Sequence, residues 1–240
     1  MKVGAVIVAA GSSVRFGGAV PKQFKDVCGR PLLAWTISRF EAARTISEIV
    51  VVVTEEQLAY TGQRVIEAFD FHKVSRVVTG GATRRESVYK GLRALPRATD
   101  LAAIHDGARP LISPVDIDRA VEVARNEKAV VVAIRASDTI KRARDGYVLS
   151  TLERDTLYQA QTPQVFQYDL ILEAHRQAAE SGEAEPFTDD AVMIEALGLK
   201  VCIVEPTSLN PKVTSREDLI VVEALLTREL HEKSENRPRS

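Results

Sequence analysis

Short apolar runs rich in β-branched residues recur along the chain, and longer segments with helical spacing separate them. The runs cover residues 3–8, 49–53, 74–78, 101–105, 129–134 and 201–204. Most are continuously apolar rather than alternating, which is typical of strands buried on both faces of a mostly parallel sheet. The sequence therefore predicts that these runs are the strands of one buried sheet.

Apolar positions at helical spacing fill most of the gaps between these strands. The segment 32–43 follows Pro31, a residue type favoured in the first turn of a helix. The other predicted helices cover 55–69, 85–95, 116–125, 168–181, 189–197 and 216–231. Such alternation of strands and helices indicates an α/β fold, a three-layer sandwich with a mostly parallel, Rossmann-like sheet.

The alternation fails after residue 135, where two extended stretches flank Asp145-Gly146. This dipeptide favours a two-residue hairpin turn. We therefore expect an insertion at 136–158 that leaves the sandwich as a protruding β-arm, either as a lid or as an arm onto a second subunit. A single domain over 1–231 and a flexible polar tail over 232–240 complete the predicted organisation.

Composition narrows the class of protein. Of the 240 residues, 45% are hydrophobic and 27% are charged, which suits a globular domain and excludes a disordered chain. The formal net charge of −1 gives no electrostatic basis for non-specific nucleic-acid binding. Cys28 and Cys202 support neither a disulfide framework nor a thiolate zinc site. Since neither a membrane-spanning run nor a signal peptide is recognisable, we expect a cytoplasmic protein without a membrane partner.

A loop of small residues follows the first predicted strand and is a candidate phosphate site. It contains Gly11, Ser12, Ser13 and Arg15, and Lys22 follows shortly after. Ligands of α/β proteins bind at the carboxyl ends of strands, and small residues let backbone N–H groups approach an anion. The glycine spacing fits neither the Walker pattern nor the dinucleotide fingerprint, which disfavours a nicotinamide-dependent oxidoreductase. The alternative interpretation is a flexible surface loop with solvated cations.

A second candidate site lies at the end of the strand predicted over 101–105. A carboxylate in the position of Asp106 is suited to holding Mg²⁺ against phosphates. The alternative is that Asp106 caps the helix beginning near Pro114. His105 is interpreted as a core histidine beneath the site, because no second histidine stands at ligand spacing. Arg109 has a carboxylate as a potential partner, and its role is left open.

The pair Gly80-Gly81 marks a third candidate site, between a predicted strand and a predicted helix with Ser87 in its first turn. A turn of this kind suits recognition of a base edge or phosphate binding at a helix N-terminus. The alternative is a plain turn with solvated arginines. Later polar residues individually fit turns or caps, and Asp189 and Asp190 fit the cap of the helix that they begin.

Together these residues resemble the 2-C-methyl-D-erythritol 4-phosphate cytidylyltransferase family over nearly the whole chain. The motifs that carry the resemblance are Ala9-Ala10-Gly11-x-x-x-Arg15, Pro21-Lys22-Gln23, Gly80-Gly81 with Ser87, His105-Asp106-x-Ala108-Arg109-Pro110, Asp138-Thr139, Thr162-Pro163-Gln164, Thr188-Asp189 and Lys212-Val213-Thr214. The first two occur in many sugar-nucleotide transferases, whereas the full set in this order is specific to the cytidylyltransferases.

The resemblance implies one nucleotidyltransferase domain that transfers CMP from CTP to 2-C-methyl-D-erythritol 4-phosphate and releases pyrophosphate. This reaction belongs to non-mevalonate isoprenoid biosynthesis. The resemblance also implies Mg²⁺ as a cofactor and a homodimer in which the arm crosses to the partner subunit. The alternatives are the same chemistry on ribitol 5-phosphate and a non-catalytic nucleotide-binding module.

Specific site residues follow from the resemblance. The implied catalytic residues are Arg15, Lys22, Arg154 and Lys212. The implied nucleotide-binding residues are Ala9, Ala10, Gly11, Ser12, Ser13, Gly80, Gly81, Ala82, Ser87, Asp106 and Gly107. The implied substrate-binding residues are Asp106, Thr139, Arg154, Thr162, Thr188 and Lys212, with Asp106 also holding the metal. Val8, Ala82 and Gly107 depart from residues seen in some relatives, and none of these departures removes a charged group.

Overall fold

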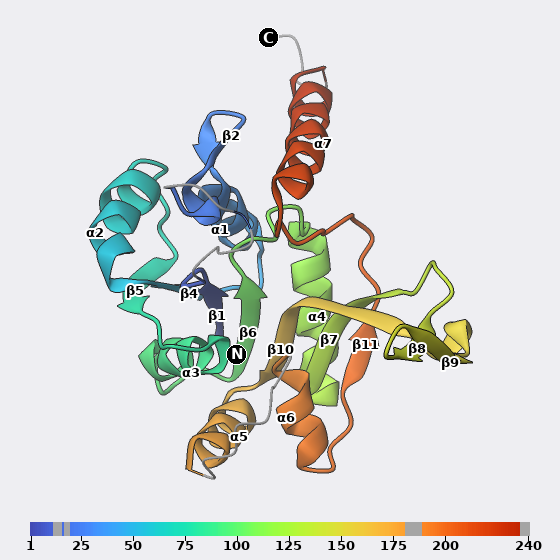
Figure 1. Cartoon of the computed structure of the whole chain (residues 1–240). Helices are drawn as coiled ribbons and strands as arrows, with labels where there is room; N and C mark the ends of the chain where they lie inside the picture. The colour runs from blue at the N-terminus through green and yellow to red at the C-terminus, as the bar shows by residue number, and fades with distance from the viewer. Residues whose placement is uncertain (12–15, 17–19, 181–188, 236–240) are drawn as a thin grey trace.

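A seven-stranded sheet with the order β11-β7-β10-β6-β1-β4-β5 forms the centre of the computed structural model, which describes residues 1–11, 16, 20–180 and 189–235 (Figure 1). The strands are β1 (Val3–Val8), β4 (Glu48–Val53), β5 (Val74–Thr79), β6 (Leu101–Asp106), β7 (Ala129–Arg135), β10 (Tyr158–Gln167) and β11 (Cys202–Val204). Neighbouring strands pair in parallel except at β10, which is antiparallel to both β6 and β7. The predicted mostly parallel α/β sheet is confirmed.

Helices cover both faces of the sheet and produce the predicted three layers (Figure 1). On one face lie α1 (Leu32–Ala42) and α4 (Pro114–Glu127), whose apolar side chains share a cluster with β1, β4, β6 and β7. On the other face lie α3 (Arg84–Ala94), α5 (Tyr168–Glu180) and α6 (Ala191–Ala196). A last helix, α7 (Arg216–Glu235), packs on α1 through a third cluster that includes Trp35 and Leu226.

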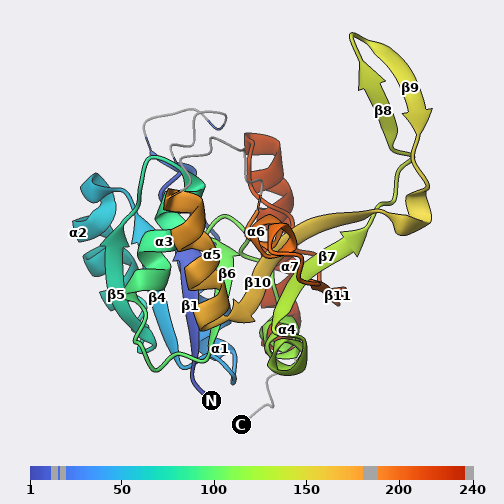
Figure 2. The ribbon, with the colours of Figure 1, turned by 90° about the horizontal axis from the view of Figure 1, so that it is seen from below.

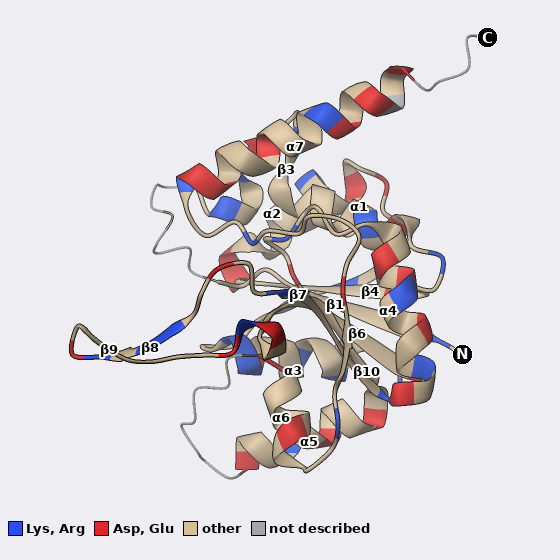
Figure 3. Cartoon of the chain, turned by 90° about the vertical axis from the view of Figure 1, so that its right-hand side faces the viewer, with Lys and Arg blue, Asp and Glu red and all other residues tan. Residues whose placement is uncertain are grey.

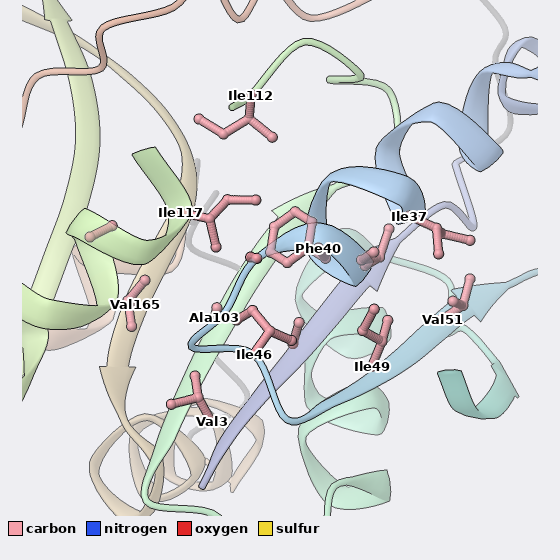
Figure 4. Close-up of a cluster of buried hydrophobic side chains, with 14 of the residues drawn as sticks. Val3, Ile37, Phe40, Ile46, Ile49, Val51, Ala103, Ile112, Ile117 and Val165 are labelled. Carbon is pink, nitrogen blue, oxygen red and sulfur yellow. The ribbon is translucent and has the colours of Figure 1, made fainter. Parts of the chain in front are cut away.

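The alternation of side chains along β1 links the two cores. Ala5 and Ile7 point into the cluster beneath α1, whereas Val6 points into the cluster beneath α3, and all three are fully buried. Figure 4 shows Phe40 and Ile37 of α1 lying over the first of these faces. Burying one such side chain contributes about 1.5–3 kcal/mol. The continuously apolar strand runs are therefore explained by apolar contacts on both faces of the sheet.

Strand β10 is absent from the sequence-based prediction, which left Thr162-Pro163-Gln164 in a loop. The structure places this tripeptide inside the sheet, at a register shift between Ala160 and Gln164 in the pairing with β7. A proline lacks a backbone donor and is tolerated in a sheet at such an irregularity. The polar composition concealed a strand in which the side chains of Thr162 and Gln164 are hydrogen-bonded inside the protein.

Some helix boundaries also differ from the prediction. The helix expected over 55–69 is three short pieces, a 3-10 turn (Glu55–Gln57), α2 (Leu58–Thr61) and a π-helical turn (Gly62–Glu67). Helix α7 continues to Glu235, so the expected polar tail does not begin at residue 232; residues 236–240 lie outside the described part. Among the described residues, no helix has the length and apolarity needed to cross a bilayer.

The predicted arm is a two-stranded antiparallel hairpin, β8 (Lys141–Arg144) and β9 (Tyr147–Thr151), that stands away from the body in Figure 2. Its turn residues Asp145 and Gly146 have positive φ angles of 52° and 82°, as a type I′ turn requires. Every residue of both strands is exposed. Three of the four residues of β8 are basic, and its ribbon is partly blue in Figure 3. The excursion begins and ends at the paired residues Arg135 and Tyr158.

Candidate active site

A pocket of about 410 Å³ opens at the carboxyl ends of β1, β5 and β6. This edge of an open α/β sheet is where such folds bind ligands. The pocket brings together residues from most of the motifs that the sequence singled out: Ala9, Ala10, Gly11, Lys22, Gln23, Gly81, Ala82, Ser87, Asp106, Ala108, Lys212 and Thr214. The three motifs at strand ends are thus parts of one site.

Glycine at position 80 allows the base-side loop to approach the strand-end loop of β1. A Cβ on Gly80 would lie 2.5 Å from the Cβ of Ala10 and 2.7 Å from Oγ of Ser87. The buried Ser87 hydroxyl accepts a hydrogen bond from the Gly81 N–H at 3.0 Å and donates to the Thr83 carbonyl at 2.9 Å. Ser87 therefore fixes the shape of the loop, which leaves backbone groups of Gly81 and Ala82 at the pocket wall.

Gly107 permits an equally close approach beneath the pocket. Its N–H donates to the Val8 carbonyl at 2.8 Å, and an added Cβ would lie 2.9 Å from the Cβ of Ala9. Gly107 does not itself line the pocket, whereas its neighbour Ala108 does. The residue acts on the site through the tight joining of the β1 and β6 ends.

Asp106 is the electrostatic centre of the pocket. Its Oδ1 lies 3.3 Å from Nε of Arg84, and its Oδ2 lies 2.8 Å from Nζ of Lys212 and 3.6 Å from Nε of Arg109. Burial by itself would raise the pKa of Asp106, but the charges of Arg84 and Lys212 outweigh it and hold the pKa well below its usual range. The carboxylate is therefore ionised at neutral pH. Arg109, whose role the sequence left open, pairs with it.

The suggestion that Asp106 caps the following helix is wrong. The cap of α4 is Ser113, whose hydroxyl accepts a hydrogen bond from the Asp116 N–H at 3.0 Å. The carboxylate of Asp106 is directed instead to three cations, of which Arg84 and Lys212 line the pocket and Arg109 does not. Its side chain is thus available for ligand chemistry rather than helix capping.

His105 lies beneath the site with no exposed surface, as the sequence interpretation held. Its Nδ1 lies 2.9 Å from Oγ1 of Thr162, and its Nε2 lies 3.0 Å from the Arg109 carbonyl. Since the Asp106 N–H donates to the same Thr162 oxygen, the hydroxyl proton points to Nδ1, and Nε2 carries the ring proton. Burial lowers the pKa of His105 to about 4, so the ring is neutral.

The loop that carries Lys212 is tied to the site from several directions. Asn210 is buried and donates to the Thr162 carbonyl at 2.8 Å, while Arg109 donates to the Asn210 carbonyl at 2.7 Å. Nζ of Lys22 donates to the Val213 carbonyl at 2.7 Å. The two lysines thus approach the pocket from segments far apart in the sequence.

The described residues could bind Mg²⁺ only together with a bound phosphate, because they supply too few ligands by themselves. No group of three His, Cys, Asp or Glu side chains that could hold a metal is found in the described part of the chain. Asp106 is the one acidic side chain among the described residues that line the pocket. Mg²⁺ in nucleotide sites commonly takes one or two carboxylates and completes its coordination with phosphate oxygens and water. An ionised Asp106 fits that arrangement, so the residues present are compatible with the metal.

Several of the predicted site residues are not placed at the pocket by the described part of the chain. Thr139 and Arg154 lie in the arm segment, are exposed, and do not line the pocket. Among the described residues, the guanidinium of Arg154 contacts its own segment, at the Ser137 carbonyl and at Asp155. The predicted residues Ser12, Ser13, Arg15 and Thr188 lie outside the described residues.

Three polar residues near the site were not assigned roles there by the sequence: Arg84, Gln164 and Asp190. Arg84 lines the pocket. Asp190 is not a side-chain cap of α6; its carboxylate pairs with Arg84, whereas Asp189 accepts from the Val192 N–H as a capping residue does. The expectation that Asp190 is a cap is therefore wrong. Had 158–167 been predicted as a strand, Gln164 would have been placed inside the protein.

Comparisons with known proteins agree on one family. The sequence model of the 2-C-methyl-D-erythritol 4-phosphate cytidylyltransferase family matches residues 3–228. Proteins of that name from Pelotomaculum thermopropionicum and Alkaliphilus oremlandii are 42% and 43% identical, each over 94% of this chain and 94% and 95% of their own lengths. The crystal structure of 4-diphosphocytidyl-2C-methyl-D-erythritol synthase from Anaerococcus prevotii is similar, with a TM-score of 0.82 at 31% identity, covering 94% of this chain and 98% of that one. The cytidylyltransferase structure from Thermus thermophilus gives a TM-score of 0.73 at 32% identity, with the same coverages.

Proposed function

Because this chain belongs to the 2-C-methyl-D-erythritol 4-phosphate cytidylyltransferase family, we propose that the pocket around Asp106 is its active site. The enzyme transfers CMP from CTP to 2-C-methyl-D-erythritol 4-phosphate in isoprenoid precursor biosynthesis. The observation that carries the assignment of the site is one ionised carboxylate among Arg84, Arg109 and Lys212, at the ligand-binding edge of the sheet.

The nucleotide is proposed to lie along the two backbone loops of the pocket. Ala9, Ala10 and Gly11 follow β1 and line the pocket, and a loop of such small residues lets triphosphate oxygens approach the backbone closely. Ser12, Ser13 and Arg15 continue this loop in the sequence and are assigned to the same triphosphate. Gly80, Gly81 and Ala82, shaped by Ser87, are assigned to the cytosine. Asp106 and Gly107 complete the proposed nucleotide-binding set.

The chemistry requires charge neutralisation more than proton transfer. An oxygen of the acceptor phosphate attacks the α-phosphorus of CTP, and the bond to pyrophosphate breaks. That oxygen is already ionised at neutral pH, so no general base is needed. His105 is consistent with this view, because it is buried and its hydrogen bonds are taken up by Thr162 and the Arg109 carbonyl. Lys22, with Arg15, would stabilise the charge that builds up on the phosphates, and Lys212 would hold the acceptor phosphate in line.

We also propose Mg²⁺ as the cofactor, with Asp106 as the protein ligand. The ion would neutralise triphosphate charge and orient the pyrophosphate leaving group. Removal of divalent cations with a chelator should abolish turnover. Isothermal titration of Mg²⁺ with CTP into the Asp106→Asn variant should show weaker ternary binding than the unaltered protein. Equal binding by both proteins would contradict the assignment of Asp106.

The arm supports a further part of the proposal, a cytoplasmic homodimer with composite active sites. Arg154 and Thr139 are exposed and do not line the pocket of their own chain, while β9 carries the exposed apolar residues Tyr147, Val148 and Leu149. A partner's pocket would give Arg154 and Thr139 a function, and Thr188 is assigned to the acceptor side. Thr162 is buried and bonded to His105 and to the Asp106 N–H, so it would support the acceptor side through Asp106. A formal net charge of −1 gives no reason to add nucleic acid as a partner.

Mixed dimers test the composite site directly. Lys22→Ala and Arg154→Ala homodimers should each be inactive or nearly so. If Arg154 acts in the partner's site, co-refolded mixtures contain heterodimers with one site carrying both lesions and one carrying none. Such a mixture should recover about a quarter of the normal activity, since about half of random dimers are mixed and half of their sites are intact. No recovery would show that Lys22 and Arg154 act within one chain or that no dimer forms.

The acceptor is tested by pyrophosphate release from CTP and Mg²⁺. We expect release with 2-C-methyl-D-erythritol 4-phosphate and none with ribitol 5-phosphate. Release with ribitol 5-phosphate alone would retain the chemistry and overturn the acceptor. CTP binding without release with either acceptor would instead favour a nucleotide-binding module.

A further inference from the structure

A second buried carboxylate, Asp190, lies behind the pocket and is not among the residues that line it. It directly precedes α6 and has no exposed surface. Its Oδ2 accepts a hydrogen bond from Nη1 of Arg84 at 2.8 Å, and its Oδ1 lies 3.3 Å from Nε2 of the buried His175. Burial by itself would raise the pKa of Asp190, but the Arg84 charge lowers it overall, so the carboxylate is ionised.

Arg84 connects this buried charge to the pocket. It is the first residue of α3, its side chain is 28% exposed, and it lines the pocket. While Nη1 binds Asp190, Nε faces Oδ1 of Asp106 at 3.3 Å. The planar guanidinium presents donors at fixed angles and is therefore suited to spanning two carboxylates. One guanidinium thus joins a carboxylate inside the protein to a carboxylate in the site.

The position of Asp190 is itself held from the sheet. Gln164 of β10 is fully buried, and its Oε1 accepts hydrogen bonds from the N–H groups of Asp190 and Ala191, both at 3.0 Å. Its Nε2 donates to Asp189 at 3.0 Å. The backbone at the start of α6 is therefore fastened to the strand next to β6, on which Asp106 lies.

The two oxygens of Asp106 have different kinds of partner. Oδ2 faces Lys212 at 2.8 Å, a flexible amine whose side chain is 37% exposed and which the proposed reaction assigns to the acceptor phosphate; Nε of Arg109 lies further from the same oxygen, at 3.6 Å. Oδ1 faces Arg84, whose other end is anchored on a buried charge. When Lys212 engages the acceptor, Arg84 remains to hold Oδ1 of Asp106 and Arg109 remains near Oδ2, and of these two arginines Arg84 is the one anchored on a second buried carboxylate.

We propose that Asp190 is a positioning residue of the active site, which acts through Arg84 to keep the Asp106 carboxylate in its working orientation without contacting any ligand. This inference rests on the proposed function of the pocket. With a neutral side chain at 190, Arg84 retains a single anionic partner, so its fork turns onto Asp106 and occupies the carboxylate needed in the site. The expected defect lies in the orientation of Asp106 and not in the packing of α6.

A double-mutant cycle of Asp190→Asn and Arg84→Gln separates a loss of Asp106 orientation from a loss of α6 packing. The asparagine keeps the shape of the side chain and one acceptor oxygen for Arg84. We expect each single variant to lower kcat/KM by about tenfold, and Asp190→Asn to add less than about twofold once Arg84→Gln is present. Independent losses that multiply in the double variant would indicate a structural effect of Asp190 and overturn the proposal.

The melting temperature is a second readout, and we expect it to change differently from kcat/KM in the same variants. Arg84→Gln leaves the Asp190 charge buried without its cation and should lower the melting temperature. Asp190→Asn in the same chain removes that charge and should restore the melting temperature, while kcat/KM stays low. Recovery of kcat/KM together with stability would show that only folding was affected, and would overturn the proposal.

Two further variants complete the experiment. Asp118→Asn is the matched control, because Asp118 is also a buried carboxylate that accepts hydrogen bonds, from Thr45, but it lies on α4 away from the pocket. Its kcat/KM should stay within about twofold of normal. Arg84→Lys keeps the charge and loses the fork, so it should lose activity nearly as Arg84→Gln does. Should Asp190→Asn fail to fold, Arg84→Lys decides alone, and normal activity in that variant overturns the proposal.

Calorimetric titration of CTP into the unaltered protein distinguishes the two levels of inference. Absence of CTP binding would overturn the proposed function of the pocket. Normal CTP binding together with unaffected Arg84→Lys and Asp190→Asn enzymes would leave that function standing and overturn the role of Asp190 alone.

Discussion

The pocket and the arm are built on opposite principles. Around Asp106, side chains from β6, β10, α3 and the segment before α7 are bonded to one another across long stretches of sequence, and those of Asp106, Thr162 and Asn210 are buried. In β8 and β9 every residue is exposed, and the pairing is between neighbours in the chain. A carboxylate that must be held among several cations requires a rigid frame, which the chain provides by itself. The arm obtains no such frame from its own chain.

Isolated two-stranded hairpins are marginally stable in water. The arm adds exposed apolar residues, with Tyr147 at 77%, Val148 at 62% and Leu149 at 61% exposure. Contiguous apolar surface on a soluble domain commonly marks an interaction site. The contrast therefore suggests that the pocket is defined within the chain, whereas the arm is completed by the proposed second copy.

The largest effect is expected from removing a pocket cation. Lys22→Ala should lower turnover by about 10²–10³-fold, or about 3–4 kcal/mol of transition-state stabilisation, because one preorganised donor to the phosphates is lost. Steady-state pyrophosphate release measures it, and Lys2→Ala, on the exposed residue that precedes β1, is the control. A folded Lys22→Ala enzyme with nearly normal turnover would remove Lys22 from the mechanism.

The buried frame beneath the pocket should also affect how the stability of the protein depends on pH. Burial lowers the pKa of His105 to about 4, against an ordinary value of 6.5 in the unfolded chain. Between these two pH values His105 binds a proton in the unfolded state but not in the folded one. The contribution of neutral His105 to the free energy of unfolding is therefore complete above pH 6.5 and is lost as the pH falls toward 4. The loss is about 3 kcal/mol.

Urea unfolding of the unaltered protein and of His105→Gln from pH 7 to pH 4 measures this contribution. The variant should show a smaller decrease of unfolding free energy across that range. Parallel curves for the two proteins would mean that His105 is no less basic in the folded state than in the unfolded one.

A smaller effect is expected from adding one methyl group to the pocket wall. In Gly80→Ala the new Cβ would overlap Ala10 and Ser87, which should cost about 1–3 kcal/mol of stability and weaken CTP binding. Gly62→Ala is the control, because open space surrounds that position. Thermal unfolding and CTP titration give both quantities. A stable Gly80→Ala protein with normal CTP affinity would show that the two loops can separate.

The smallest effect on the stability of the chain itself is expected in the arm. Val148→Ser with Leu149→Ser should change the unfolding free energy of dilute protein by less than about 0.5 kcal/mol, as for other exposed positions. The same protein should sediment increasingly as monomer, since apolar interface area is lost. A large fall in the stability of the monomer would show that the arm is supported by its own chain.

The elements that the sequence predicts correctly are those whose signals lie within the segment itself. Strands such as β1 and β6 were predicted because both of their faces are buried, which makes their residues continuously apolar. The grouping of Lys22, Asp106 and Lys212 in one pocket agrees with the family resemblance and, for Asp106, with its place at a strand end. The hairpin of the arm was indicated by the local signal Asp145-Gly146.

Strand β10 and the Arg84–Asp190 pair depended on distant contacts. Gln164 reads as a loop residue until α6 is known to lie against it. Arg84 and Asp190 are separated by 106 positions, and no local pattern indicates that the two will pair. Buried polar partners of this kind are specified by the whole fold and not by the segment that contains them.

The arm leaves the sheet at Arg135 and returns at Tyr158, and these two residues are neighbours across β7 and β10. Its length can therefore change in evolution without rethreading any strand, much as a loop between two hairpin strands can be exchanged. The strands of the body keep their geometry when the arm changes, whereas a change at Arg154 or Thr139 would also alter the proposed composite site. A chimaera carrying the arm of a distant relative should accordingly retain the fold of the body and, in the proposed dimer, acquire the relative's choice of partner.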